Sequence, residues 1–202
     1  FQDAERSMDH YHWENSASIE SWYGKLTGHF GESSAVSAFY LKNVQGLDGN
    51  SVDPSIKGAH VHAWGAGATI DLGDSGLNID GDFIQTRGNR DLGHANLWTA
   101  GLNYGKVDLN KPGSFTLGVH YVRADAGAYL LGNSALDMTD QLEYGWDNGT
   151  GVKFWVAKAG VAVQKNVELD AYYNFGAKAF DRYDDSTKDP ANTWGVELNY
   201  AF

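Results

Sequence analysis

Apolar and polar residues alternate with a period of two along most of the chain, most regularly over residues 193–202. There every even position is apolar and every odd position is polar or small. Because successive side chains of a strand point to opposite faces, this alternation predicts a strand with one wholly apolar face. That face has aromatic residues at both ends and aliphatic residues between them, as Trp194, Val196, Leu198, Tyr200 and Phe202.

The same alternation predicts nine strands, and therefore an all-β fold. The predicted strands cover residues 22–30, 37–42, 63–70, 77–83, 98–104, 115–121, 155–164, 167–175 and 193–202. The pattern is ambiguous in the second strand. There Ser37, Phe39 and Leu41 could form the apolar face, which leaves Lys42 on the polar face.

The connections between these strands alternate between short and long. Short turns around residues 31–33, 73–76, 109–113 and 164–166 separate long polar loops at about 46–59, 87–94, 124–150 and 181–191. Outer-membrane barrels show this alternation, because their periplasmic turns are short and their extracellular loops are long. We therefore predict a transmembrane antiparallel up-and-down β-barrel. The alternative is a soluble β-sandwich or jelly roll, in which Val, Ile and Leu are expected to dominate the apolar face.

The number of strands bears on how such a barrel would close. If Phe202 lies at the periplasmic rim, the first strand starts outside, whereas bacterial barrels have an even number of strands and both ends in the periplasm. Residues 1–18 alternate poorly and are predicted to be a weak strand or loop. Either they supply a tenth strand and residues 1–202 form a single β-barrel domain, or residues 1–202 are the carboxyl-terminal portion of a larger barrel domain.

Composition changes this picture in three respects. The chain is 42% hydrophobic with a mean hydropathy of −0.43, values that also fit a barrel whose strands each have one polar face. The absence of Cys excludes disulfides and thiolate metal sites. With 26 acidic and 15 basic residues the net charge is −11, which argues against a nucleic-acid partner.

Two segments carry a family resemblance. Phe202 with Tyr200 resembles the signal that barrel-assembly machinery reads in outer-membrane proteins, and residues 151–173 look like the last hairpin of general porins. The chain most resembles the porins of diderm Firmicutes, in which an S-layer homology domain that binds peptidoglycan precedes the barrel.

The resemblance implies a homotrimer in the bacterial outer membrane, in contact with its lipid, with roughly 16 strands in each barrel. It implies a water-filled channel for passive diffusion of ions and small hydrophilic solutes. It also implies a tether to peptidoglycan through an upstream domain that residues 1–202 do not include. No cofactor is expected.

In such a barrel the charged residues of the polar face line the pore. By alternation these are Lys25, Lys42, Asp80, Asp82, Lys158, Glu168, Asp170, Lys178 and Glu197. The acids of the last two strands are expected to be neighbours across the wall. The charges could either produce a transverse field that orients solutes or simply solvate a wide lumen.

The loop over residues 124–150 is the best candidate for a constriction. It is long, and its apolar groups at 128–131 and 135–138 need burial, either against the inner wall or against a neighbouring subunit. Its charged residues are all acidic: Asp125, Asp137, Asp140, Glu143 and Asp147. We therefore predict a channel that prefers cations.

Other functions have weaker support. Asp80 and Asp82, with His62, His94 and His120, are residue types that an outer-membrane protease uses at its extracellular rim. These two acids, however, lie in mid-strand rather than at the rim. His10 and His12 lack a third fixed metal ligand. We therefore predict no catalytic residue and no metal. The alternatives are a structural or adhesive barrel without a pore, a small barrel enzyme, or a soluble lectin-like sandwich.

Overall fold

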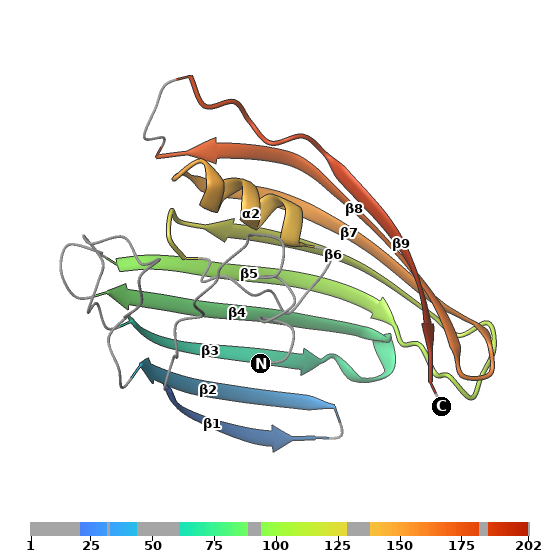
Figure 1. Cartoon of the computed structure of the whole chain (residues 1–202). Coiled ribbons are helices and arrows are strands. Elements are labelled where there is room, and N and C mark those ends of the chain that lie inside the picture. The colour runs from blue at the N-terminus through green and yellow to red at the C-terminus, as the bar shows by residue number, and fades with distance from the viewer. Residues whose placement is uncertain are drawn as a thin grey trace, which may run out of the picture.

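The computed structural model describes residues 21–31, 33–43, 61–88, 94–128, 138–181 and 186–201. These residues form one antiparallel sheet in which each strand pairs with the next along the chain (Figure 1). The strands are β1 (Ser21–Phe30), β2 (Ser34–Asn43), β3 (Val61–Asp71), β4 (Leu77–Gly88), β5 (His94–Gly105), β6 (Phe115–Ala124), β7 (Gly151–Gln164), β8 (Val167–Phe180) and β9 (Thr193–Tyr200). All nine predicted strands and their up-and-down order are confirmed.

Two short helices accompany the sheet among the described residues. The 3-10 helix η1 (Gly73–Ser75) lies between β3 and β4, and α2 (Thr139–Asp147) lies between β6 and β7. In the part of the chain that the structure describes, no helix is both long enough and apolar enough to span a membrane.

The sheet is open, with β1 and β9 as its edges. Because every neighbouring pair is antiparallel, β1 and β9 run in the same direction and cannot pair with each other in an antiparallel ladder. An antiparallel barrel built on this sheet therefore needs an odd number of additional strands.

The predicted alternation of short and long connections does not hold throughout, because the β4–β5 connection (residues 89–93) is shorter than the β5–β6 connection (residues 106–114). The connections β1–β2, β3–β4, β5–β6 and β7–β8 lie at one end of the sheet, and the other four lie at the opposite end (Figure 1). We call the first the turn end and the second the loop end. The two faces are equally distinct. We call the face against which α2 packs the inner face, and the opposite one the outer face.

The outer face exposes large apolar side chains along its whole length. Among the exposed large apolar residues, Tyr23 lies on the inner face and Leu72 in a turn, and the others belong to the outer face by their register. These are Trp22, Leu26, Phe30, Val36, Tyr40, Trp64, Ile70, Ile79, Trp98, Leu102, Tyr104, Phe115, Leu117, Val119, Trp155, Val163, Leu169, Tyr173, Trp194, Val196, Leu198 and Tyr200.

Aromatic rings form two rows on this face. The row near the loop end comprises Trp22, Tyr40, Trp64, Phe83, Trp98, Tyr121, Trp155, Tyr173, Phe175 and Trp194. The row near the turn end comprises Phe30, Tyr104, Phe115 and Tyr200. Some of these rings touch: the centroids of Trp98 and Tyr121 lie 5.1 Å apart, and those of Tyr104 and Phe115 lie 6.1 Å apart. On β5, β6 and β9 the two rows are six positions apart, which is about 20 Å along a strand.

The inner face has a dry core at its loop end, under α2. Phe154 and Val156, which interrupt the polar face of the seventh predicted strand, are fully buried there together with Val122. Leu142 of α2 belongs to the same cluster. At Gly145 a Cβ would lie 3.1 Å from Cγ1 of Val152, so the helix sits close against β7.

A bulge in β8 changes the face of one predicted inner residue. Lys153 pairs with Lys178, but Trp155 pairs with Phe175, so β8 contains one extra residue between these pairs. Gly176 there has φ 63°, a conformation that favours glycine. The prediction that Lys178 faces inward is therefore wrong: Lys178 shares the outer face with Lys153, while its neighbour Ala177 is buried in the inner core.

In β2, where the alternation left the faces ambiguous, the prediction that Lys42 lines the pore is also wrong. Lys42 pairs with Trp22 and His62 on the outer face, so it does not line the inner face. The ring of Phe39 instead turns inward over Gly65, where any Cβ would overlap it. Tyr40 takes the outer position and stacks on His62, with ring centroids 6.5 Å apart.

Cysteine cross-linking tests the bulge, since the chain has no native Cys. Because directly opposed Cβ atoms lie about 5 Å apart, the double variant Lys153→Cys/Lys178→Cys should cross-link rapidly with a short bifunctional reagent whose two ends alkylate thiols. The control Lys153→Cys/Ala177→Cys should not, because its thiols lie on opposite faces. Mass spectrometry detects the product, and the reverse pattern would contradict the bulge.

Candidate functional site

Toward the turn end, beyond the α2 core, the inner face becomes polar. Its ionisable side chains are Lys25, His29, Asp71, Asp80, Asp82, His120, Lys158, Glu168, Asp170 and Glu197. Seven of the nine predicted pore-lining residues are therefore on this face, and Lys42 and Lys178 are not. Asp71 was missed, although continuing the alternation of the third predicted strand by one position would have included it.

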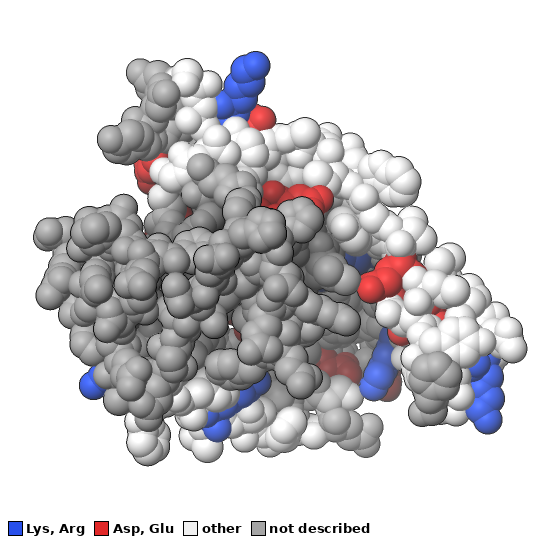
Figure 2. Space-filling model, in the orientation of Figure 1, with Lys and Arg blue, Asp and Glu red and all other residues white. Residues whose placement is uncertain are grey.

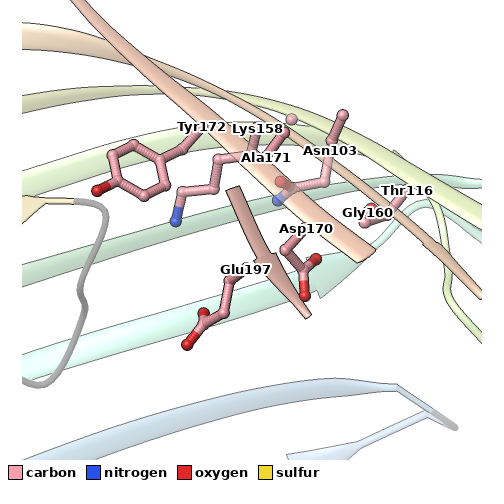
Figure 3. Close-up of a pocket in the computed structure, with 10 residues that line it drawn as sticks. Asn103, Thr116, Lys158, Gly160, Asp170, Ala171, Tyr172 and Glu197 are labelled. Carbon is pink, nitrogen blue, oxygen red and sulfur yellow. The ribbon is translucent and has the colours of Figure 1, made fainter. Parts of the chain in front are cut away.

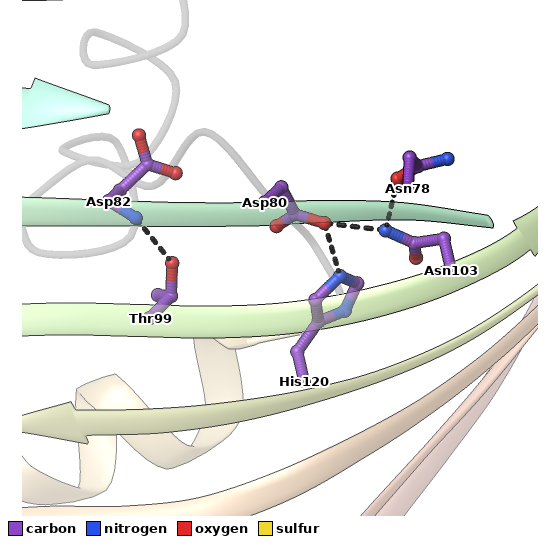
Figure 4. Close-up of polar contacts among 6 residues, drawn as sticks. All are labelled: Asn78, Asp80, Asp82, Thr99, Asn103 and His120. Carbon is purple, nitrogen blue, oxygen red and sulfur yellow. Dashed lines mark hydrogen bonds and ion pairs between the residues drawn. The ribbon is translucent and has the colours of Figure 1, made fainter. Parts of the chain in front are cut away.

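The centre of this polar surface is a hydrogen-bonded network across β4, β5 and β6 (Figure 4). Nε2 of His120 lies 3.1 Å from Oδ1 of Asp80. Nδ2 of Asn103 donates to the same Asp80 oxygen and, at 2.9 Å, to Oδ1 of Asn78. Asp82 donates its backbone N–H to Oγ1 of Thr99 at 3.2 Å, and its carboxylate extends away from that bond.

The network depends on a glycine in β5. His120 is buried and lies across Gly101, the register partner that it shares with Asp80. A Cβ at position 101 would overlap the imidazole ring and lie 2.9 Å from Oδ1 of Asp80. Gly101 thus leaves the room in which the two ionisable groups meet.

A second polar region lies over β7, β8 and β9, where a hollow of about 350 Å³ opens on the inner face. Lys158, Asp170 and Glu197 project into it (Figure 3). Asp170 is the direct register partner of Glu197 and accepts a 2.8 Å hydrogen bond from Nδ2 of Asn199. Glu168 lies opposite Asn199, so the three acids of the last two strands are neighbours, as the alternation predicted.

The residues of the predicted constriction loop separate into two groups. Asp140 and Glu143 are exposed on α2, and Asp147 is the last residue of that helix. Asp125 does not belong to this group. Its Oδ2 accepts hydrogen bonds from the backbone and the side chain of Asn96 in β5. Asp137 lies outside the described residues.

Polar contacts fix α2 over the inner face. Gln141 is buried and donates to the carbonyl oxygen of Ala191 at 2.8 Å. The hydroxyl of Tyr144 donates to the carbonyl oxygen of Lys188. Residues 138–150 of the loop thus pack against the sheet of their own chain, which is one of the two ways of burying the loop that the sequence left open.

The remaining candidates lie apart from this surface. His62 belongs to the outer face, and His94 binds Arg87 at the loop end, with Nε of Arg87 2.7 Å from Nδ1 of the imidazole. Tyr200 is exposed on the outer face, whereas Phe202, His10 and His12 lie outside the described residues. No group of three potential metal ligands occurs within the described ranges.

The face toward the viewer in Figure 2 has acidic and basic side chains beside each other over the carboxyl-terminal strands. Such a surface suits hydrated ions and polar solutes, because it offers charges and hydrogen-bonding groups in an open arrangement. The chain matches no known protein-family model, and it has no significant match among curated proteins.

The substitution Gly101→Ala tests how the network is built. The added methyl group should displace His120 from Asp80 and lower the free energy of unfolding by about 1–3 kcal/mol. Gly24→Ala is the matched control, because nothing lies within 4 Å of a Cβ there, and it should be neutral or slightly stabilising. Denaturant titration measures both, and equal effects would contradict this account.

Proposed function

We propose that this sheet forms the wall of a transmembrane β-barrel in the bacterial outer membrane. The barrel encloses a water-filled channel for passive diffusion of ions and small hydrophilic solutes. One observation carries the proposal: between two aromatic rows the outer face is a continuous apolar surface, and at that level of the strands the ionisable groups lie on the inner face. Lipid-facing barrel walls have this arrangement, with aromatic girdles at the two interfaces.

The exposure of the outer face favours lipid over water as its surroundings. Trp22 is 72% exposed, Leu26 79% and Trp194 74%. Soluble monomers rarely expose apolar patches of this extent. A β-sandwich would bury them against a second sheet, and the described residues form only one. The spacing of the aromatic rows, about 20 Å along a strand, is comparable with the apolar band of about 25 Å on outer-membrane barrels.

The charge of the inner face supports a preference for cations. Its strands carry the carboxylates of Asp71, Asp80, Asp82, Glu168, Asp170 and Glu197 against the ammonium groups of Lys25 and Lys158. Two lysines that the sequence assigned to this face lie on the other one. The exposed carboxylates of α2 add negative charge near the loop end. A channel lined in this way concentrates cations and repels anions.

The family resemblance extends the proposal to a homotrimer tethered to peptidoglycan through an upstream domain. A barrel without an open pore, with a structural or adhesive role, is the second candidate. It is favoured by the packing of α2 on the inner face, because a helix in that position occupies part of the lumen.

Planar-bilayer recording separates the two candidates. The purified protein should give discrete conductance steps, and its reversal potential in a KCl gradient should show a preference for K⁺ over Cl⁻. A barrel plugged by α2 would insert without opening, and a reversal potential on the Cl⁻ side would contradict an acidic lumen.

A pair of lysine variants tests which face lines the channel. Lys158→Gln removes a positive charge from the inner face and should raise the ratio of K⁺ to Cl⁻ permeability, by up to about fivefold. Lys178→Gln removes the same charge from the outer face and should leave the ratio unchanged. The reversal potential in a KCl gradient measures both, and an effect of Lys178→Gln equal to that of Lys158→Gln would contradict the assignment of faces.

A further inference from the structure

Basic side chains form a row across the outer face, at the loop end of seven consecutive strands. The row consists of Lys42, His62, Arg87, His94, Arg123, Lys153 and Lys178. It has two parts. From β2 to β5, the first four residues are successive register partners, and from β6 to β8 the last three are.

This arrangement opposes like charges directly. Arg123 is the register partner of Lys153, and Lys153 is the register partner of Lys178. Three cationic side chains therefore lie side by side on strands that are about 5 Å apart. Directly opposed like charges destabilise a sheet. Repulsion between like charges that repeats over neighbouring strands is expected where a bound ligand compensates it. Here a compensating ligand is an anion that contacts several strands.

Within the described ranges, carboxylates neutralise the row only in part. Asp125 lies between its two halves, with Oδ1 3.9 Å from Nε of Arg123. The guanidinium of Arg123 also lies 4.1 Å from the centroid of the Phe180 ring. Among the described residues, no carboxylate comes within ion-pair distance of Lys153 or Lys178.

The position of the row identifies the kind of anion. On four strands each basic residue is two positions closer to the loop end than an aromatic residue of the outer face. These pairs are Tyr40 and Lys42, Trp64 and His62, Tyr121 and Arg123, and Trp155 and Lys153. In a barrel wall the aromatic row lies at the interface between hydrocarbon and headgroups, so the next outward-facing position lies at the level of lipid phosphates.

We propose that the basic row binds the phosphate groups of anionic lipids in the leaflet that meets the loop end of the sheet. The proposal rests on the membrane-embedded barrel proposed above. Arg and Lys side chains bind phosphate through charge-assisted hydrogen bonds, and adjacent strands let one headgroup contact several of them. The acidic inner face does not compete for these lipids, because it faces the lumen.

Quenching of tryptophan fluorescence by brominated lipids provides the test. The full chain is reconstituted in vesicles of phosphatidylcholine with phosphatidylglycerol, of which one or the other is brominated. Trp155 and Trp98 adjoin the row, so preferential quenching by brominated phosphatidylglycerol reports anionic lipid at this site. The variant Arg123→Gln/Lys153→Gln/Lys178→Gln should reduce the relative association constant for phosphatidylglycerol about fivefold or more.

The matched control removes three positive charges from the turn end, as Lys106→Gln/Lys111→Gln/Lys165→Gln, and should retain the preference. Loss of the preference in both variants, or in neither, would overturn the lipid site. Quenching of the wild-type protein by both brominated lipids without preference would overturn the site and leave the barrel intact. Absence of quenching by either lipid would instead contradict membrane insertion itself, and with it the proposed function.

Discussion

The antiparallel hydrogen-bonded ladder that runs unbroken from β1 to β9 is the constraint on which the rest of this structure depends. Directly opposed residues of such a ladder share a face, so the register of each pair transmits the choice of face from strand to strand. Asp80, Gly101, His120 and Val156 are successive partners across four strands for this reason. A slip of one residue in any strand would exchange its apolar and polar sets.

The ladder also allows the inner face to change character along the strands. Phe154 and Val156 are buried under α2, whereas Lys158, the next inner residue of β7, lines a polar hollow. A single strand therefore combines an apolar and a polar segment on the same side. This explains why period-two alternation is less regular in β7 than in β9, where the inner positions are polar or small throughout.

Strand positions could be predicted because the alternation follows directly from backbone geometry, and Asp170 and Glu197 were correctly expected to be neighbours. The bulge and the contacts between strands could not be predicted, because they depend on backbone irregularities and on register, which the alternation does not contain. The bulge at Gly176 is a backbone irregularity at one of 25 glycines, and it reversed the face of Lys178. The contact between Asp80 and His120 depends on the register of β4, β5 and β6, which their connecting loops do not reveal.

The inner-face glycines have a consequence for the width of any lumen that this wall bounds. His120 lies over Gly101 and Asp170 over Gly160, so each long polar side chain rests along the backbone of the neighbouring strand instead of standing upright. At these two positions the bore of such a lumen is limited by the backbone rather than by upright side chains. Larger residues in place of these glycines would narrow such a lumen in two ways. They would add their own volume, and they would push His120 and Asp170 away from the backbone into the lumen.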